Sequence, residues 1–136
     1  MIKLRVVNYE KFIAETKARI DAKVKEKTEQ VANKVWEGVI GGEPGVDYPY
    51  WSGGYVKSWD FSEGPAWGDY YRSDRNDPNK FAPPSVHLQH LYKTYTLVTV
   101  SNANPYASHI EYIGSPSRHD PWKVAFSAYI HATKLV

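Results

Sequence analysis

Residues 9–40 read YEKFIAETKARIDAKVKEKTEQVANKVWEGVI, and this stretch decides the fold. It holds no proline and only one glycine, close to its end. Apolar residues recur along it, and Lys17 and Thr28 fill the two gaps, so that the mean spacing approaches the helical repeat of about 3.6 residues. The apolar residues of this stripe are Ile13, Ile20, Val24, Val31, Val35 and Val39. The pattern predicts one long helix, capped by Asn8 and ended by the two glycines that follow it.

The predicted helix is long for the chain that carries it. It would measure about 48 Å, whereas a compact chain of 136 residues has a diameter of only about 35–40 Å. We therefore expect part of the helix to project and to meet another molecule; a kinked helix kept within one monomer is the alternative. Seven basic and six acidic residues between positions 9 and 40 are typical of a solvated face. Before the helix, residues 2–7 alternate apolar and basic side chains, which predicts a short strand.

Composition excludes several classes of protein. The chain has no cysteine, so it can hold no disulfide framework, thiolate zinc site or thiol nucleophile. A formal net charge of +2 is too close to neutral to imply an obligate polyanionic partner. Apolar runs are too short for a membrane helix, and no signal peptide is visible at the N-terminus. We expect a globular chain made in the cytoplasm, with no membrane partner.

The remainder of the chain has a different character. Only three of the twenty aromatic residues lie in the first forty residues, and all nine prolines follow residue 43. Aromatic residues alternate over residues 55–61, which predicts a strand. Residues 62–86 are expected to form a long surface loop. Residues 88–101 are rich in Tyr, Thr, Val and Leu, which predicts one long strand.

Two helices are expected near the C-terminus. Asn104 and Pro105 are typical of a helix start, and this helix would end before Gly114. Asp120 and Pro121 repeat the device. The helix after them is expected to bury Trp122, Ala125, Phe126, Tyr129 and Ile130. The predicted fold class is α+β in a single domain: a long N-terminal helix packed on a small antiparallel sheet, with two short C-terminal helices.

Candidate residues for catalysis or metal binding form no convincing set. His87 and His90 make an H-x-x-H pair, and His109 and His119 lie near acidic residues, but neither spacing is that of a typical metal site. Glu111 has no nucleophile or orienting group near it in the sequence, so a carboxylate bonded to backbone or to tyrosine hydroxyls is the better interpretation. We expect no catalytic residue, no metal and no cofactor.

Two other classes stay open as alternatives. A small nucleic-acid-binding module is compatible with a pI near 8.7 and with many Tyr and Trp residues, because aromatic rings stack on bases. After position 40 the chain has only eight Lys and Arg residues and nine acidic residues, so no basic groove is predicted there. A small toxin-like enzyme is the other alternative.

Two segments resemble the tail-completion (neck, head–tail joining) proteins of lambdoid-type tailed phages. Residues 49–58, PYWSGGYVKS, resemble the P-x-x-[T/S]-G-x-L-x-x-S segment that follows the long N-terminal helix of that family. Residues 100–114, VSNANPYASHIEYIG, resemble its V-x-N-x-x-P-Y-A-x-x-[I/V]-E-[F/Y]-G segment. The helix after Asp120 and Pro121 is similar to the family's closing proline-started helix. The chain departs from the family pattern at Tyr55, where Leu is usual, and at Ile113, one extra residue before the glycine.

The resemblance implies scaffold roles for the matching residues. Ser52 and Gly53 would turn the chain sharply into a strand, Pro105 would start a helix, and a buried Tyr106 would dock that helix on the sheet. On that basis Tyr106→Ala would destabilise the fold by about 3 kcal/mol. The structural motif comprises Pro49, Ser52, Gly53, Ser58, Pro105, Tyr106, Ala107, Glu111 and Gly114.

The function that the resemblance implies is structural. The chain would be a virion protein at the head–tail interface, assembled in the host cytoplasm as a ring, with six copies as the expectation. Its partners would be other copies of itself and the neighbouring neck, head-completion and tail-terminator proteins, with DNA only as passing cargo. A tail terminator ring is the closest alternative. From the stripe and the aromatic loop, the expected interface residues are Val31, Val35, Trp36, Trp67, Tyr70 and Tyr71.

Overall fold

Helix α1, Tyr9–Gly41, dominates the computed structural model, which describes residues 9–41, 54–66, 68, 88–114 and 120–135. The other elements are α2 (Gly54–Lys57), β1 (Trp59–Glu63), β2 (Val98–Asn102), α3 (Ala107–Tyr112) and α4 (Val124–Leu135). The predicted α+β class and the long helix are confirmed. The expected strand over residues 2–7 and most of the expected loop over residues 62–86 lie outside the described residues.

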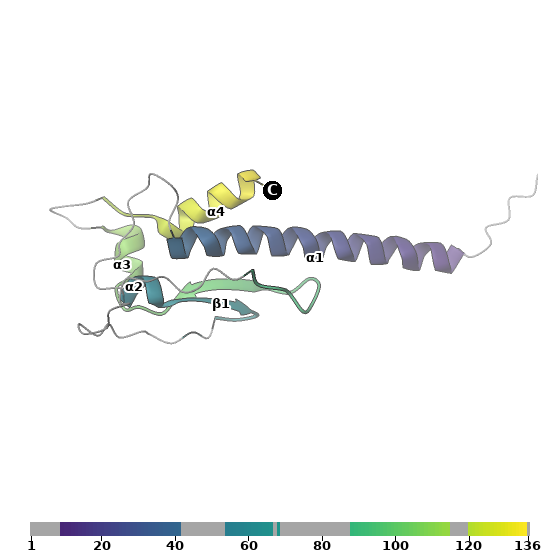
Figure 1. Cartoon of the computed structure of the whole chain (residues 1–136), viewed down its shortest axis with the longest axis horizontal. Coiled ribbons are helices and arrows are strands. Elements are labelled where there is room, and N and C mark those ends of the chain that lie inside the picture. The colour runs from purple at the N-terminus through teal and green to yellow at the C-terminus, as the bar shows by residue number, and fades with distance from the viewer. Residues whose placement is uncertain (1–8, 42–53, 67, 69–87, 115–119, 136) are drawn as a thin grey trace, which may run out of the picture.

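Only one end of α1 belongs to the body of the molecule (Figure 1). Its buried residues all fall in the last three turns, where α4 covers one side and the sheet the other. Most of residues 9–27, the outer half of α1, extends beyond the body; the Tyr95 hydroxyl reaches this half and donates to Asp21 Oδ1 at 2.9 Å. Phe12 and Ile20 are 59% and 53% exposed there. The expectation that part of the helix projects is confirmed.

The sheet of the described residues pairs β1 with β2 in antiparallel register. Trp59 lies opposite Asn102, and Phe61 lies opposite Val100. The prediction of a strand over residues 55–61 was right for 59–61 and wrong for 55–58, where α2 forms instead. The Ser58 hydroxyl donates to the Gly54 carbonyl at 2.6 Å and so closes this helical turn. A short apolar run does not distinguish a strand from a buried helical turn.

The prediction of one long strand over residues 88–101 was right for 98–101 and wrong for 88–97. Only Val98–Asn102 forms a strand; residues 88–97 follow α1 in bends and turns. Side chains of α1 form hydrogen bonds with backbone N–H and C=O groups of this segment. In a sheet, a neighbouring strand would provide those bonds. Asn33 donates from Nδ2 to the Gln89 carbonyl at 2.9 Å and accepts the Gln89 N–H at 2.8 Å. Glu29, one turn earlier, accepts the Leu91 N–H at 3.1 Å.

The stability of the fold is expected to fall in acid because of Glu29. The Leu91 N–H lowers the pKa of this carboxyl below its usual 4.5, and His90, with Nδ1 at 2.9 Å from Oε1, lowers it further. A carboxyl whose pKa is lowered by folding stabilises the protein above its unfolded pKa and loses that contribution as the pH falls through its folded pKa. Glu29→Gln should therefore lower the free energy of unfolding by about 1 kcal/mol at pH 7. Urea titrations between pH 7 and pH 3 should show that the free energy of unfolding falls less with acid in Glu29→Gln than in the parent. An equal fall in both proteins would contradict this role of Glu29.

The core joins the inner end of α1 to α2, β1 and α4. Trp36 packs edge-on against Phe61, with ring centroids 6.1 Å apart, and Tyr55 packs similarly against Trp59 at 5.7 Å. The buried residues that make it are Trp36, Val39, Ile40, Tyr55, Val56, Trp59, Val124 and Ala128. Among the described helices, none has the length and apolar character needed to cross a membrane.

The face that α4 presents to the core was predicted only in part: Trp122 and Ala125 pack against the core as expected. Phe126 and Tyr129, expected to be buried, are more than half exposed. The buried side chains are instead Val124, Ala128 and Ala132, at steps of four residues. A Cβ on Gly38 of α1 would lie only 2.8 Å from the Cβ of Ala128. The two helices thus approach so closely that only small residues fit between them, and the aromatic rings turn outward.

Candidate functional site

The two motif segments lie against each other at one end of the sheet. The Asn102 side chain donates from Nδ2 to the Tyr55 carbonyl at 2.8 Å, and the Ala103 N–H donates to the Ser58 carbonyl at 3.3 Å. Ser58 is 2% exposed and bonds within α2. The structure therefore brings together residues more than forty positions apart in the sequence. Pro49, Ser52 and Gly53 lie outside the described residues.

A pair of asparagine turns leads from β2 into α3. The Asn102 Oδ1 accepts the Asn104 N–H at 2.9 Å, and the Asn104 Oδ1 accepts the Tyr106 N–H at 2.8 Å. Because these turns intervene, α3 begins at Ala107 and Pro105 lies outside the helix, so the prediction that Pro105 occupies its first position was wrong. Tyr106 is 65% exposed, so the expectation of a buried ring was wrong as well. We now expect only a small effect of Tyr106→Ala on stability.

Gly114 ends α3 as predicted. Its φ of +72° lies in the left-handed region, which glycine adopts without a steric penalty. The N–H groups of Ile113 and Gly114 both donate to the His109 carbonyl at 2.9 Å and so satisfy the end of the helix. Ala107, at the other end of α3, packs against the core as expected.

Glu111 of α3 caps the N-terminus of α4. It is 8% exposed, and its Oε2 and Oε1 accept the N–H groups of Ala125 and Phe126 at 3.0 and 2.9 Å. Lys123, which precedes α4, has a φ of +49° and a side chain without an acceptor, so the cap comes from a different helix. The negative charge also lies at the positive end of the α4 dipole. The prediction that Glu111 bonds to backbone is confirmed, and both carboxylate oxygens are taken.

Removing this cap is expected to destabilise the protein. Glu111→Ala leaves two N–H groups at the start of α4 without their acceptors, so the free energy of unfolding should fall by about 2–3 kcal/mol. Glu111→Gln keeps one acceptor and a similar shape, so its loss should be about half as large. Urea denaturation of the two variants measures the difference. Equal stability of Glu111→Ala and the parent would show that the cap contributes nothing.

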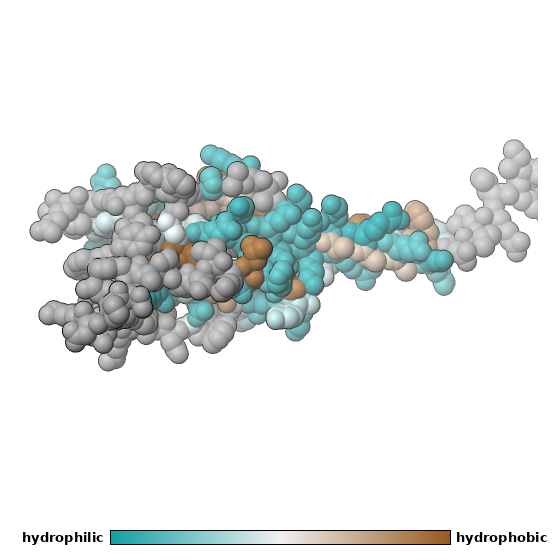
Figure 2. All heavy atoms as spheres, in the orientation of Figure 1, coloured by the Kyte–Doolittle hydropathy of each residue, from teal (hydrophilic) through white to brown (hydrophobic). Residues whose placement is uncertain are grey.

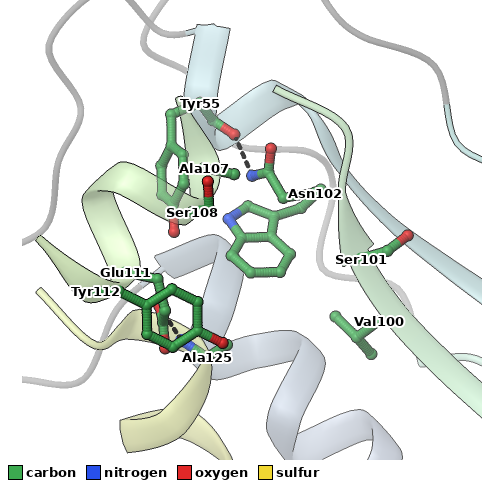
Figure 3. Close-up of a pocket in the computed structure, with 10 residues that line it drawn as sticks. Tyr55, Val100, Ser101, Asn102, Ala107, Ser108, Glu111, Tyr112 and Ala125 are labelled. Atoms are coloured by element: carbon green, nitrogen blue, oxygen red, sulfur yellow. Dashed lines mark hydrogen bonds between the residues drawn. The ribbon is translucent and has the colours of Figure 1, made fainter. Parts of the chain in front are cut away.

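A pocket of about 210 Å³ opens beside Glu111 (Figure 3). Burial raises the pKa of the Tyr55 hydroxyl at its wall, and the charge of Glu111 raises it further, so this phenol stays protonated at neutral pH. The Glu111 carboxylate at the same pocket accepts the N–H groups at the start of α4. The lining residues are Tyr55, Trp59, Val100, Ser101, Asn102, Ala107, Ser108, Glu111, Tyr112 and Ala125. Among these residues, Asn102 and Glu111 form hydrogen bonds with backbone groups of other segments and so stabilise the fold.

The described histidines do not assemble into a metal site. His90 is exposed and bonds to Glu29 of α1, and His109 is exposed on α3. Within residues 9–41, 54–66, 68, 88–114 and 120–135, no three His, Asp or Glu side chains gather closely enough to hold an ion. His87 and His119 lie outside these ranges.

The expected interface residues fall into three groups. Trp36 is 5% exposed and belongs to the core, so its ring is covered by its own chain. Val31 and Val35 are half-buried, and their part in an interface stays a prediction. Trp67, Tyr70 and Tyr71 lie outside the described residues.

The largest exposed apolar side chains of α1 lie in its outer half. They are Tyr9, Phe12, Ile13 and Ile20. Figure 2 shows hydrophilic residues over most of the visible face of α1, with hydrophobic atoms between them along the projecting part. Ile13 and Ile20 belong to the apolar stripe seen in the sequence. The sequence alone does not show which residues of the stripe are buried, because that depends on where the body ends.

No protein-family model, curated protein or solved structure matches the chain.

Proposed function

We propose that the chain is a structural virion protein of the phage neck, which completes the tail and joins it to the DNA-filled capsid as part of a ring of six copies. The motif segments at residues 49–58 and 100–114 support this assignment through their resemblance to tail-completion proteins. The geometry is compatible with a scaffold role, because Ser58, Asn102 and Glu111 bond to backbone of their own chain.

The observation that carries the proposal is the outer half of α1. Four large apolar side chains, Tyr9, Phe12, Ile13 and Ile20, are about half exposed or more on a helix that the body does not cover. Apolar groups gathered on an exposed surface mark contact sites with other molecules. A protein that acts by assembling with copies of itself and with its neighbours requires such a surface.

Deletion of the gene from the phage that encodes the chain tests the assignment. We expect filled heads and finished tails that do not join, with joining restored when the protein is supplied from a plasmid. Tails of uncontrolled length would favour the tail terminator alternative instead. Normal infectious particles, or a salt-sensitive shift of duplex DNA by the purified protein together with its absence from virions, would overturn the proposal.

A further inference from the structure

The outer half of α1 carries a seam with a heptad pattern. Its residues alternate at steps of three and four, which places them along one side of a helix. They are Glu10, Ile13, Lys17, Ile20, Val24 and Lys27. Ile13 and Ile20 are 47% and 53% exposed, whereas Val24 is partly buried. Ile13, Ile20 and Val24 are the apolar members of this seam. The charged residues between them favour a partner whose charges are complementary.

The same side of α1 already receives a helix at its inner end. Gly38 lies about four turns beyond Val24, so both face nearly the same direction, and Gly38 contacts Ala128 of α4. Helix α4 runs antiparallel to α1 from its inner end and stops well short of its outer half (Figure 1). The seam is therefore the continuation of a surface that packs a helix, and no described residue of α4 reaches its outer part.

We propose that two copies of the chain pair through this seam, with the outer halves of α1 antiparallel about a twofold axis between Ala18 and Arg19. In this register Ile13 lies opposite Val24 of the second copy. The aliphatic stem of Lys17 lies over Ile20 of the second copy, and by symmetry every contact occurs twice. The α1 helix of the second copy then lies on the same side of α1 as α4 does, beyond the end of α4, and runs in the same direction as α4.

Charge selects this arrangement. In the antiparallel register Glu10 meets Lys27 of the second copy. The pairing does not use Asp21, whose Oδ1 accepts the Tyr95 hydroxyl of its own chain at 2.9 Å. A parallel, in-register pair would place Lys17 against Lys17 and Lys27 against Lys27, which is unfavourable. The seam is thus complementary to itself only when the helices run in opposite directions.

The contact is short, which sets its expected strength. Residues 10–27 overlap over about 27 Å, and two single helices of this length bury less surface than the roughly 1,200 Å² at the lower limit of standard stable interfaces. We therefore expect a reversible dimer whose fraction rises with protein concentration. The inference concerns the free chain and does not depend on the neck assignment.

Analytical ultracentrifugation of the full chain over a concentration series tests the dimer. The parent should shift from one chain to two as its concentration rises. Ile20→Asp should stay monomeric and keep the fold of the monomer, because the Ile20 side chain is 53% exposed in the single chain. Lys27→Glu should weaken the dimer at least tenfold, and adding Glu10→Lys should restore it. Ala22→Asp, on the opposite, exposed face of the helix, is the matched control and should dimerise like the parent.

The direction of pairing is tested by cross-linking, since the chain has no cysteine of its own. A mixture of Ile13→Cys and Val24→Cys should form a disulfide between chains. Neither variant alone should do so, because identical positions in the antiparallel pair are separated by about 16 Å along the axis. A monomer at all concentrations, cross-linking of a single variant, or an Ile20→Asp protein that still dimerises would each overturn the proposal.

Discussion

Trp36→Ala is expected to lower the free energy of unfolding by about 3–5 kcal/mol, the range found for large aromatic residues removed from a core. Trp36 lies on the inner end of α1 and is only 5% exposed. Its ring packs edge-on against Phe61 and belongs to the cluster that joins the helix to the sheet. Its removal therefore opens a cavity where α1 contacts the rest of the body.

Trp36→Phe is the matched control for this variant. The indole Nε1 of Trp36 is buried and has no hydrogen-bond partner, so replacing the indole loses volume but no polar contact. We expect Trp36→Phe to lose less than half of what Trp36→Ala loses when both are measured by urea denaturation. A Trp36→Ala protein that is as stable as the parent but fails to assemble would show that Trp36 serves an interface instead of the core.

Gly38→Val is expected to lower the free energy of unfolding by about 2–3 kcal/mol, because it overfills the contact between α1 and α4. A Cβ at this position would lie 2.8 Å from the Cβ of Ala128, a distance that real side chains do not tolerate. Ala128 is 2% exposed and sits on the helix backbone, so it cannot move aside by rotating a side chain. The only response is for α4 to shift away from α1.

Gly41→Val provides the matched control. Gly41 is the last residue of the same helix, and a Cβ there meets nothing within 4 Å. The two variants introduce the same side chain three residues apart, so a difference in their thermal unfolding reports the contact with α4. If Gly38→Val melts at the same temperature as Gly41→Val, the close packing of α4 on α1 is wrong.

The elements predicted correctly from the sequence are those with a long, regular pattern. Helix α1 has thirty-three residues, and its period is repeated often enough to identify it. The glycine at position 114 was predicted to end α3 because few other residues adopt its backbone conformation. Such features are local, so the sequence near them is sufficient.

The wrong predictions concern features that distant contacts decide. Residues 88–97 have a composition typical of strands, but Glu29 and Asn33 of α1 bond to the backbone of the segment and hold it outside the sheet. Phe126 and Tyr129 of α4 were expected in the core, but Gly38 brings α1 so close that only a residue as small as Ala128 fits opposite it. Neither effect is visible until the two segments are placed side by side.

The candidate site was predicted in part. Glu111 was expected to bond to backbone, which is correct, but its position as the cap of α4 depends on how α3 and α4 meet. Tyr106 was expected to be buried and is exposed. Part of α1 is exposed because the helix is longer than the body. The sequence therefore predicted that α1 projects, but not how many of its residues do so.

Electron cryo-microscopy of the assembled particle, reconstructed at the head–tail junction without imposed rotational symmetry, would reveal whether the chain assembles with other copies of itself. We predict six copies of the chain in a closed ring, with α1 of each copy in contact with a neighbouring chain. A single copy without a ring, or a junction from which the chain is absent, would contradict this prediction.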